Sequence, residues 1–87
     1  MPGIALVGVD AAGGTQLGMQ VPWFKVNGRP VVVLGDSVAS HGLFPHIAPV
    51  MVEGSSAFRA GGIPVCRAGH LASCGHSTSG RPFFKIP

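Results

Sequence analysis

Two segments of the chain carry side chains of the kinds that bind transition metals. His41 and His46 lie in one segment, and Cys74 and His76 lie in the other. A structural Zn²⁺ ion takes four nitrogen or sulfur ligands in a tetrahedron, and one cysteine with three histidines meets that requirement. The spacings H-x4-H and C-x-H are not those of a zinc finger, so the fold must bring the donors together. The sequence therefore predicts one structural zinc ion per chain, with solvated loop side chains as the alternative.

Two other residues are reserve ligands for this ion. His70 aligns with Asp36 in the internal repeat described below, so it is as well suited to capping backbone groups in a turn as to binding metal. Cys66 aligns with Val32 in a predicted strand, where a free cysteine packs as a small hydrophobic residue. Either residue could still replace one of the four predicted ligands, His46 in particular.

A catalytic zinc site is the main alternative in terms of chemistry. Such a site keeps one position open for water and usually has a carboxylate base nearby. The only carboxylate side chains in the sequence are those of Asp10, Asp36 and Glu53. A small zinc hydrolase would show three protein ligands plus water, with Asp36 or Glu53 within reach. Four protein ligands would indicate a structural ion instead.

An internal repeat relates two parts of the chain. Residues 28–36 align with residues 62–70, and the two segments share Gly, Pro, Val and Gly in register. Asn27-Gly28 and Gly61-Gly62 stand at the start of the two copies, and such pairs readily adopt the positive φ angles of a tight β-turn. The repeat therefore predicts two equivalent hairpins.

A partial third copy is divided between the two ends of the chain. Residues 4–8 resemble the strand that leads to a glycine, and residues 79–86 resemble the strand that enters a hairpin. Three quasi-equivalent β units imply an approximately threefold shape. Loops that leave equivalent corners after Gly35 and Gly69 should then converge at one end, which would bring the metal donors together.

Length and composition favour a single small all-β domain over residues 1–87. The chain has 87 residues, of which 14 are glycine and 8 proline, with 46% hydrophobic and 10% charged residues. Frequent glycine and proline disfavour helices, whereas the apolar content is too high for a disordered chain. We expect short strands, turns and long loops. We expect the aromatic residues to lie mostly in the core, and any that are exposed on one end would form an apolar docking patch. The six aromatic residues are Trp23, Phe24, Phe44, Phe58, Phe83 and Phe84.

Charge and hydropathy make nucleic-acid binding and membrane insertion poor predictions. The formal net charge is +3, but the six basic residues are scattered singly, which is a weak electrostatic footprint for nucleic acid. Only the basic pI favours a nucleic-acid-binding zinc module, and the distribution of the basic residues does not. The apolar runs are far shorter than the roughly 20 residues of a membrane-spanning helix, and the N-terminus does not resemble a secretory signal. These features predict a chain made in the cytoplasm.

Taken together, these motifs resemble the PAAR-repeat proteins, which cap the spikes of type VI secretion systems and contractile phage tails. The family motif is proline-alanine-alanine-arginine followed by a glycine-aspartate corner, and it appears in altered form at residues 30–36 and 64–70. Only the second copy keeps the arginine, Arg67, and only the first keeps the aspartate, Asp36. Residues 50–58 also resemble the strand that precedes each hairpin in this family.

The resemblance implies a cone of short β-strands and hairpins with a zinc-bound tip. Its blunt base would sit on a trimeric VgrG or phage spike protein, which the cone would cap and sharpen to aid membrane piercing. Carried over residue by residue, the zinc ligands are His41, His46, Cys74 and His76. The implied role is structural rather than enzymatic, with effectors as further partners and without stable membrane insertion. The protein would be cytoplasmic before assembly and then be injected or become part of a phage tail.

Overall fold

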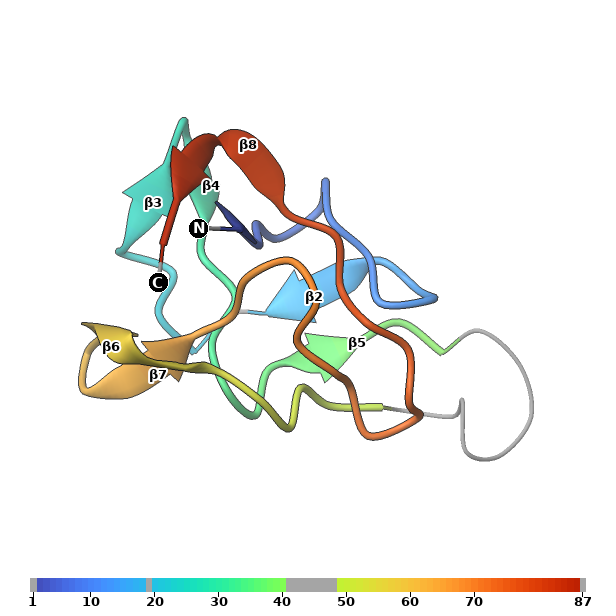
Figure 1. Cartoon of the computed structure of the whole chain (residues 1–87). Helices are drawn as coiled ribbons and strands as arrows, with labels where there is room; N and C mark the ends of the chain where they lie inside the picture. The colour runs from blue at the N-terminus through green and yellow to red at the C-terminus, as the bar shows by residue number, and fades with distance from the viewer. Residues whose placement is uncertain (1, 19, 41–48, 87) are drawn as a thin grey trace.

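The computed structural model describes residues 2–18, 20–40 and 49–86, and all of its regular elements are short strands (Figure 1). The strands are β1 (Gly3–Ile4), β2 (Gln16–Gly18), β3 (Lys25–Val26), β4 (Arg29–Pro30), β5 (Ser37–Val38), β6 (Ser55–Ala60), β7 (Ile63–Val65) and β8 (Arg81–Lys85). They form four antiparallel pairs, β1 with β8, β2 with β5, β3 with β4 and β6 with β7. The all-β prediction is confirmed. None of the described residues belongs to a helix that could cross a membrane.

Two of the pairs are hairpins with the two-residue turns that the sequence predicts. Asn27 and Gly28 have φ angles of 54° and 82°, and Gly61 and Gly62 have 58° and 81°. Positive φ at both central residues is the geometry of a type I′ turn, which asparagine and glycine adopt with the least steric cost. The repeat thus produces equivalent hairpins in β3–β4 and β6–β7.

The third equivalent pair, β1 with β8, joins the two ends of the chain. Lys85 is paired with Gly3, and the backbone N–H of Ile86 donates to the carbonyl of Pro2 at 3.0 Å. The chain termini take the place that a turn occupies in the other two units. Both termini therefore lie at the same broad end of the molecule as the two hairpins (Figure 1).

A closed ring of backbone hydrogen bonds joins the three units at the centre of the molecule. The N–H of Ala5 donates to the carbonyl of Cys66 (3.1 Å), Cys66 donates to Val32 (2.8 Å), and Val32 donates to Ala5 (3.0 Å). A second closed set of bonds runs around the three units in the opposite direction; its donors and acceptors are Val7 to Pro30, Leu34 to Pro64 and Ala68 to Gly3, at 2.9, 2.9 and 2.8 Å. Over the two sets, each unit donates to both neighbours and accepts from both. This cyclic pairing gives the single chain its approximate threefold symmetry.

The apolar core consists of two clusters, one on each side of this ring. The cluster under the hairpins contains Ile4, Leu6, Val21, Val26, Val31, Val33, Ala60, Val65 and Ile86. The cluster toward the loops contains Ala5, Ala12, Val32, Val38, Met51, Cys66 and Ala72. The second cluster contains more small side chains, as expected for a body that narrows along its length. The molecule measures 32 × 23 × 22 Å.

Candidate functional site

Three glycine corners lead from the central ring into the loops on the side of the second core cluster. We call this side of the molecule the narrow half and its far end the narrow end. Gly8, Gly35 and Gly69 occupy these corners with φ angles of 83°, 89° and 95°. Residues with a Cβ atom adopt such angles at a steric cost, which explains the glycine in each copy. The corner at Gly8 is the third member of the repeat, so the partial third copy expected at the N-terminus is complete at this point.

The first two corners are each closed by a buried carboxylate. One oxygen of Asp10 accepts a hydrogen bond from the N–H of Leu6 at 2.8 Å, and one oxygen of Asp36 accepts from the N–H of Val33 at 2.9 Å. Asp10 also forms the salt bridge to Arg81, at 2.9 Å. The comparison of the internal repeats does not reveal the role of Asp10, because the corner between Gly8 and Asp10 is one residue longer than the other two. The order of a glycine followed within two residues by an aspartate is the sequence signal that indicates this corner.

His70 closes the third corner. Its Nδ1 atom accepts a hydrogen bond from the backbone N–H of Arg67 at 3.1 Å. Partial burial lowers the pKa of His70, and the nearby Arg67 side chain lowers it further, so the neutral imidazole that can accept this bond is favoured. Of the two roles that the sequence left open for His70, the structure places it in the turn role.

Cys66, the other reserve ligand, lies in the central ring and is fully buried. Its thiol donates to the backbone carbonyl of Glu53 at 3.2 Å. Burial raises the pKa of Cys66 to about 12, with smaller contributions from Asp36 and Glu53. Metals bind the thiolate form. A protonated core cysteine is therefore the role that the structure supports for Cys66.

Cys74 and His76 lie on a tight hairpin formed by residues 71–77. The N–H of Ala72 donates to the carbonyl of His76 at 2.9 Å, and Gly75, at φ 91°, donates to the carbonyl of Ala72 at 3.0 Å. Cys74 is half-buried against the second core cluster, and His76 is exposed. A thiol and an imidazole on one short hairpin are donors of the kind that structural zinc takes.

This hairpin lies beside the chain segments that flank residues 41–48. The N–H of Ser73 donates to the carbonyl of Val50 at 2.7 Å, and Val38 in β5 donates to the carbonyl of Pro49 at 2.8 Å. The predicted ligands His41 and His46 lie outside the described residues, so the structure places only two of the four. Among the residues that it does describe, no three His, Cys, Asp or Glu side chains are grouped as a metal site.

The two carboxylates that a zinc hydrolase would use are both engaged with backbone groups. Asp36 is buried and accepts hydrogen bonds from the N–H groups of Val33 and Gln20, at 2.9 and 3.3 Å. Glu53 accepts a hydrogen bond from the N–H of Leu71 at 2.7 Å. Both therefore have a structural role in holding the loops of the narrow half.

The broad end carries a cluster of aromatic residues that lie in, or directly before, the three β pairs of the repeat. Phe24, Phe58 and Phe84 are half-buried against the first core cluster, and the ring centroid of Phe58 is 6.1 Å from those of both Phe24 and Phe84. Trp23 and Phe83 are more exposed, at 66% and 58%. We call these five residues the aromatic patch. The aromatic patch combines both roles expected for the aromatic residues, core packing and an exposed apolar surface. The sixth aromatic residue, Phe44, lies outside the described residues.

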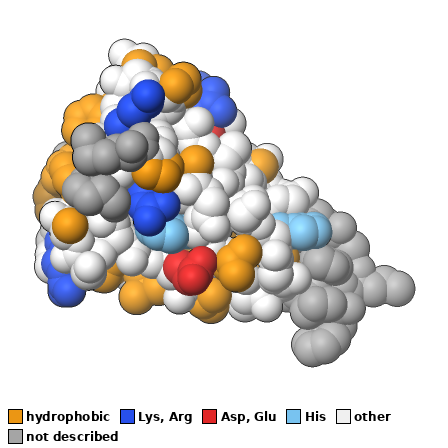
Figure 2. All heavy atoms as spheres, viewed as in Figure 1, with side chains coloured by type: hydrophobic (Ala, Val, Ile, Leu, Met, Phe, Trp, Pro, Cys, Tyr) orange, Lys and Arg blue, Asp and Glu red, His pale blue; other side chains and the backbone are white. Residues whose placement is uncertain are grey.

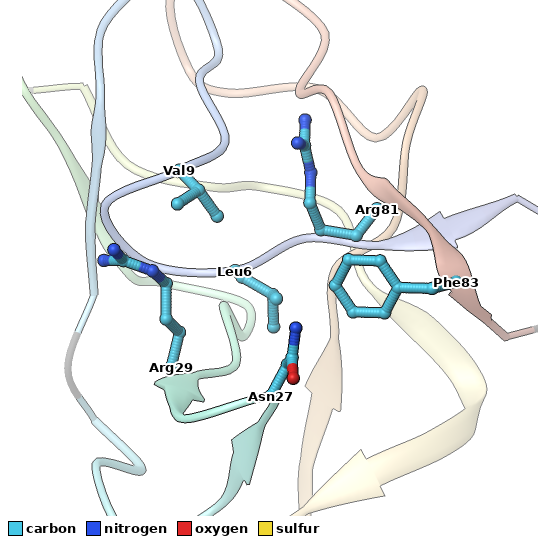
Figure 3. A pocket seen from close by; sticks show the side chains of 6 residues that line it. All are labelled: Leu6, Val9, Asn27, Arg29, Arg81 and Phe83. Atoms are coloured by element: carbon cyan, nitrogen blue, oxygen red, sulfur yellow. The ribbon is translucent and has the colours of Figure 1, made fainter.

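A pocket of about 210 Å³ lies on the flank of the broad end, between β8 and the β3–β4 hairpin. It is lined by Leu6, Val9, Asn27, Arg29, Arg81 and Phe83 (Figure 3). Arg29 and Arg81 lie on opposite sides of Val9 and Leu6, and Arg81 is already paired with Asp10. With no carboxylate, imidazole or thiol in its lining, this pocket lacks the donors of the predicted zinc site.

Comparison with known proteins agrees with the geometry of the corners and hairpins. The family model described as PAAR motif matches residues 7–78 of the 87-residue chain, which includes both altered motif copies and all three corners. No curated protein matches the sequence significantly. Proteins with this motif form a family of spike tips in type VI secretion systems and contractile phage tails, associated with VgrG or other spike proteins. Since the match covers most of the sequence, the chain belongs to the PAAR-motif family.

Proposed function

We propose that this protein is a structural tip that caps the trimeric VgrG or phage spike protein of a contractile injection machine. The observation that carries the proposal is the closed ring of hydrogen bonds through Ala5, Val32 and Cys66, which gives one chain three equivalent faces. A trimer ends in three identical surfaces, and a single chain can cover all of them only if it repeats one surface three times. The broad end, with its three β pairs and the aromatic patch, is the end suited to this contact.

The strand pairs of the broad end support the same assignment. In the three sheets β3–β4, β6–β7 and β1–β8, the inner strands β4, β7 and β1 bond to one another through the ring, so the outer strands β3, β6 and β8 are the ones to which a further strand could be added. Strands of the spike that add to these edges would continue its sheets into the tip. Partly exposed aromatic side chains beside such edges would add apolar contact area.

We further propose that the narrow end is stabilised by one Zn²⁺ ion held by His41, His46, Cys74 and His76. The 71–77 hairpin carries Cys74 and His76, and its hydrogen bond to Val50 holds it beside a segment that flanks residues 41–48. A narrow point has little room for an apolar core, whereas a structural zinc site contributes on the order of 10 kcal/mol. The ion would keep the tip rigid as the machine drives it through a membrane.

The test of the spike-tip function is complex formation with the purified trimeric spike protein of the same machine. Light scattering coupled to size-exclusion chromatography should give a complex of one chain with three spike subunits. An equimolar complex of three chains per trimer would contradict the argument from internal symmetry. Failure of the folded, zinc-loaded chain to associate with the spike would contradict the function itself. Before assembly the protein should be found in the cytoplasm.

A further inference from the structure

Three basic residues occupy the same position in the three β pairs of the broad end. Lys25 is paired with Pro30, Arg59 with Pro64 and Lys85 with Gly3. All three cations are exposed. Each of them follows a phenylalanine of the aromatic patch and precedes a buried residue of the first core cluster. We call Lys25, Arg59 and Lys85 the cation triad.

No acidic group of the described chain neutralises the cation triad. Asp10 is paired with Arg81, and Asp36 is buried in its corner. Glu53 accepts a hydrogen bond from Leu71 in the narrow half. In Figure 2 the visible Lys and Arg side chains likewise lie over the broad half, with none on the described part of the narrow half.

The symmetry of the triad indicates what it can recognise. Three cations related by the internal repeat fit three anionic groups that are related by threefold symmetry. A trimeric protein supplies such groups by repeating one acidic residue in each subunit. Duplex DNA and lipid surfaces offer many anionic groups but no threefold arrangement of them. The half-buried phenylalanines beside the cations favour a partner that also has an apolar surface.

We propose that the cation triad binds three carboxylates on the end of the trimeric spike, one from each subunit, around an apolar contact with the aromatic patch. The identity of the partner rests on the function proposed above. The spike surface should therefore contain an acidic residue at the rim and apolar residues at the centre. Opposite charges at such a rim mainly raise the association rate and select the correct partner.

The experiment measures the affinity of the zinc-loaded chain for the purified trimeric spike at several salt concentrations. The triple variant Lys25→Glu, Arg59→Glu, Lys85→Glu should bind about 100-fold more weakly than the wild type, and Lys25→Glu alone about 5-fold more weakly. Raising the salt concentration should weaken wild-type binding but not binding of the triple variant. Thermal unfolding of each variant shows whether it is folded.

Arg29→Glu is the matched control for Lys25→Glu. Arg29 is an exposed cation on the same hairpin, and its guanidinium reaches toward the corner at Gly8 rather than belonging to the triad. This variant should bind within about 2-fold of the wild type. A second control, Lys25→Arg, Arg59→Lys, Lys85→Arg, keeps the charges and should retain binding. Replacing the facing spike carboxylates with lysine should restore binding of the triple glutamate variant.

The outcomes separate this inference from the proposed function. If the wild type and the triple glutamate variant bind the spike equally well, the cation triad does not bind carboxylates, but the spike-tip function stands. Equal loss of binding in the charge-preserving variant would also overturn the inference, since shape rather than charge would then decide. Triad-dependent binding to duplex DNA or anionic vesicles that is as tight as binding to the spike would overturn it as well. A wild-type chain that does not bind the spike overturns both proposals.

Discussion

His70 accepts a hydrogen bond from the backbone N–H of Arg67, and an aspartate accepts the equivalent bond in each of the other two corners. The imidazole Nδ1 atom accepts a hydrogen bond from the Arg67 N–H at 3.1 Å, where Asp10 and Asp36 accept equivalent bonds at 2.8 and 2.9 Å. The three corners therefore share one geometry with two different acceptors. Because a histidine can lose its acceptor by protonation in mildly acidic solution, only the third corner should be sensitive to pH near neutrality.

Replacing His70 tests this capping role. His70→Ala removes the acceptor for the Arg67 N–H and should lower the free energy of unfolding by about 1 kcal/mol. His70→Asp restores the acceptor found in the other corners and should leave the stability at or above that of the wild type. Urea denaturation at pH 7.5 measures both changes. Loss of stability in the aspartate variant as large as in the alanine variant would contradict the assignment.

The lowered pKa of His70 predicts the direction of a pH effect. In the folded state the pKa lies below its ordinary value of 6.5, so the unfolded chain takes up the proton first as the pH falls. The contribution of His70 to stability is thus complete above about pH 6.5 and decreases as the pH falls through the lower folded-state value. The His70→Asp variant should lack this loss of stability between pH 7.5 and 5. If the difference in unfolding free energy between the wild type and His70→Asp stays the same over that range, His70 is not the source of the pH effect.

The zinc proposal predicts different behaviour for the two cysteines. Metal analysis should find one zinc per chain, which His41→Ala and Cys74→Ser should lose, while Cys66→Ala should keep it. Because the pKa of Cys66 is raised to about 12, its thiol should react with a disulfide reagent at pH 8 only after unfolding. Cys74 should react in the native chain once a chelator has removed the metal. Retention of zinc by Cys74→Ser would contradict the proposed ligand set.

Spectroscopy of the bound metal distinguishes the structural site from the hydrolase alternative. X-ray absorption of the zinc-loaded chain should show one sulfur and three nitrogen ligands with no coordinated water. Removing the metal should lower the melting temperature markedly, because the site would contribute on the order of 10 kcal/mol. Three protein ligands with a bound water would instead favour the hydrolase.

Asp10 should be the most important carboxylate for stability. Asp10→Ala leaves the Leu6 N–H, the Ser79 hydroxyl and the Arg81 guanidinium without their acceptor and should cost about 3 kcal/mol. Glu53→Ala is the control, since it removes an exposed carboxylate that accepts one backbone hydrogen bond, and it should cost less than about 1 kcal/mol. Chemical denaturation compares the two. Equal losses would show that burial of Asp10 is not what matters.

Two glycines should respond differently to the same substitution. A Cβ atom at Gly80 would overlap the backbone carbonyl of Gly3, whereas a Cβ atom at Gly62 would meet nothing within 4 Å. Gly62 has a φ angle of 81°, so Gly62→Ala should cost only the steric penalty of that conformation, about 1 to 2 kcal/mol. Gly80→Ala must separate β1 from the chain before β8 and should cost about 3 kcal/mol or more. Melting curves of the two variants that coincide would contradict this explanation.

The sequence by itself determined the local features of this protein. The turns at Asn27-Gly28 and Gly61-Gly62 follow from the φ angles that these residues tolerate, and the repeat predicted equivalent hairpins and a threefold shape. It also contained the repeated order of phenylalanine, cation and apolar residue that forms the cation triad. That signal becomes meaningful only when the two chain ends are recognised as one β pair.

The tertiary structure alone decided which chemistry each reserve residue has. Cys66 becomes a buried thiol because two other units close around it, and His70 becomes a capping group because its corner matches those of Asp10 and Asp36. These roles depend on burial and on hydrogen bonds between residues far apart in the chain. A repeat shows that positions are equivalent, but only the packed structure determines which of them lie in the core and which face a partner.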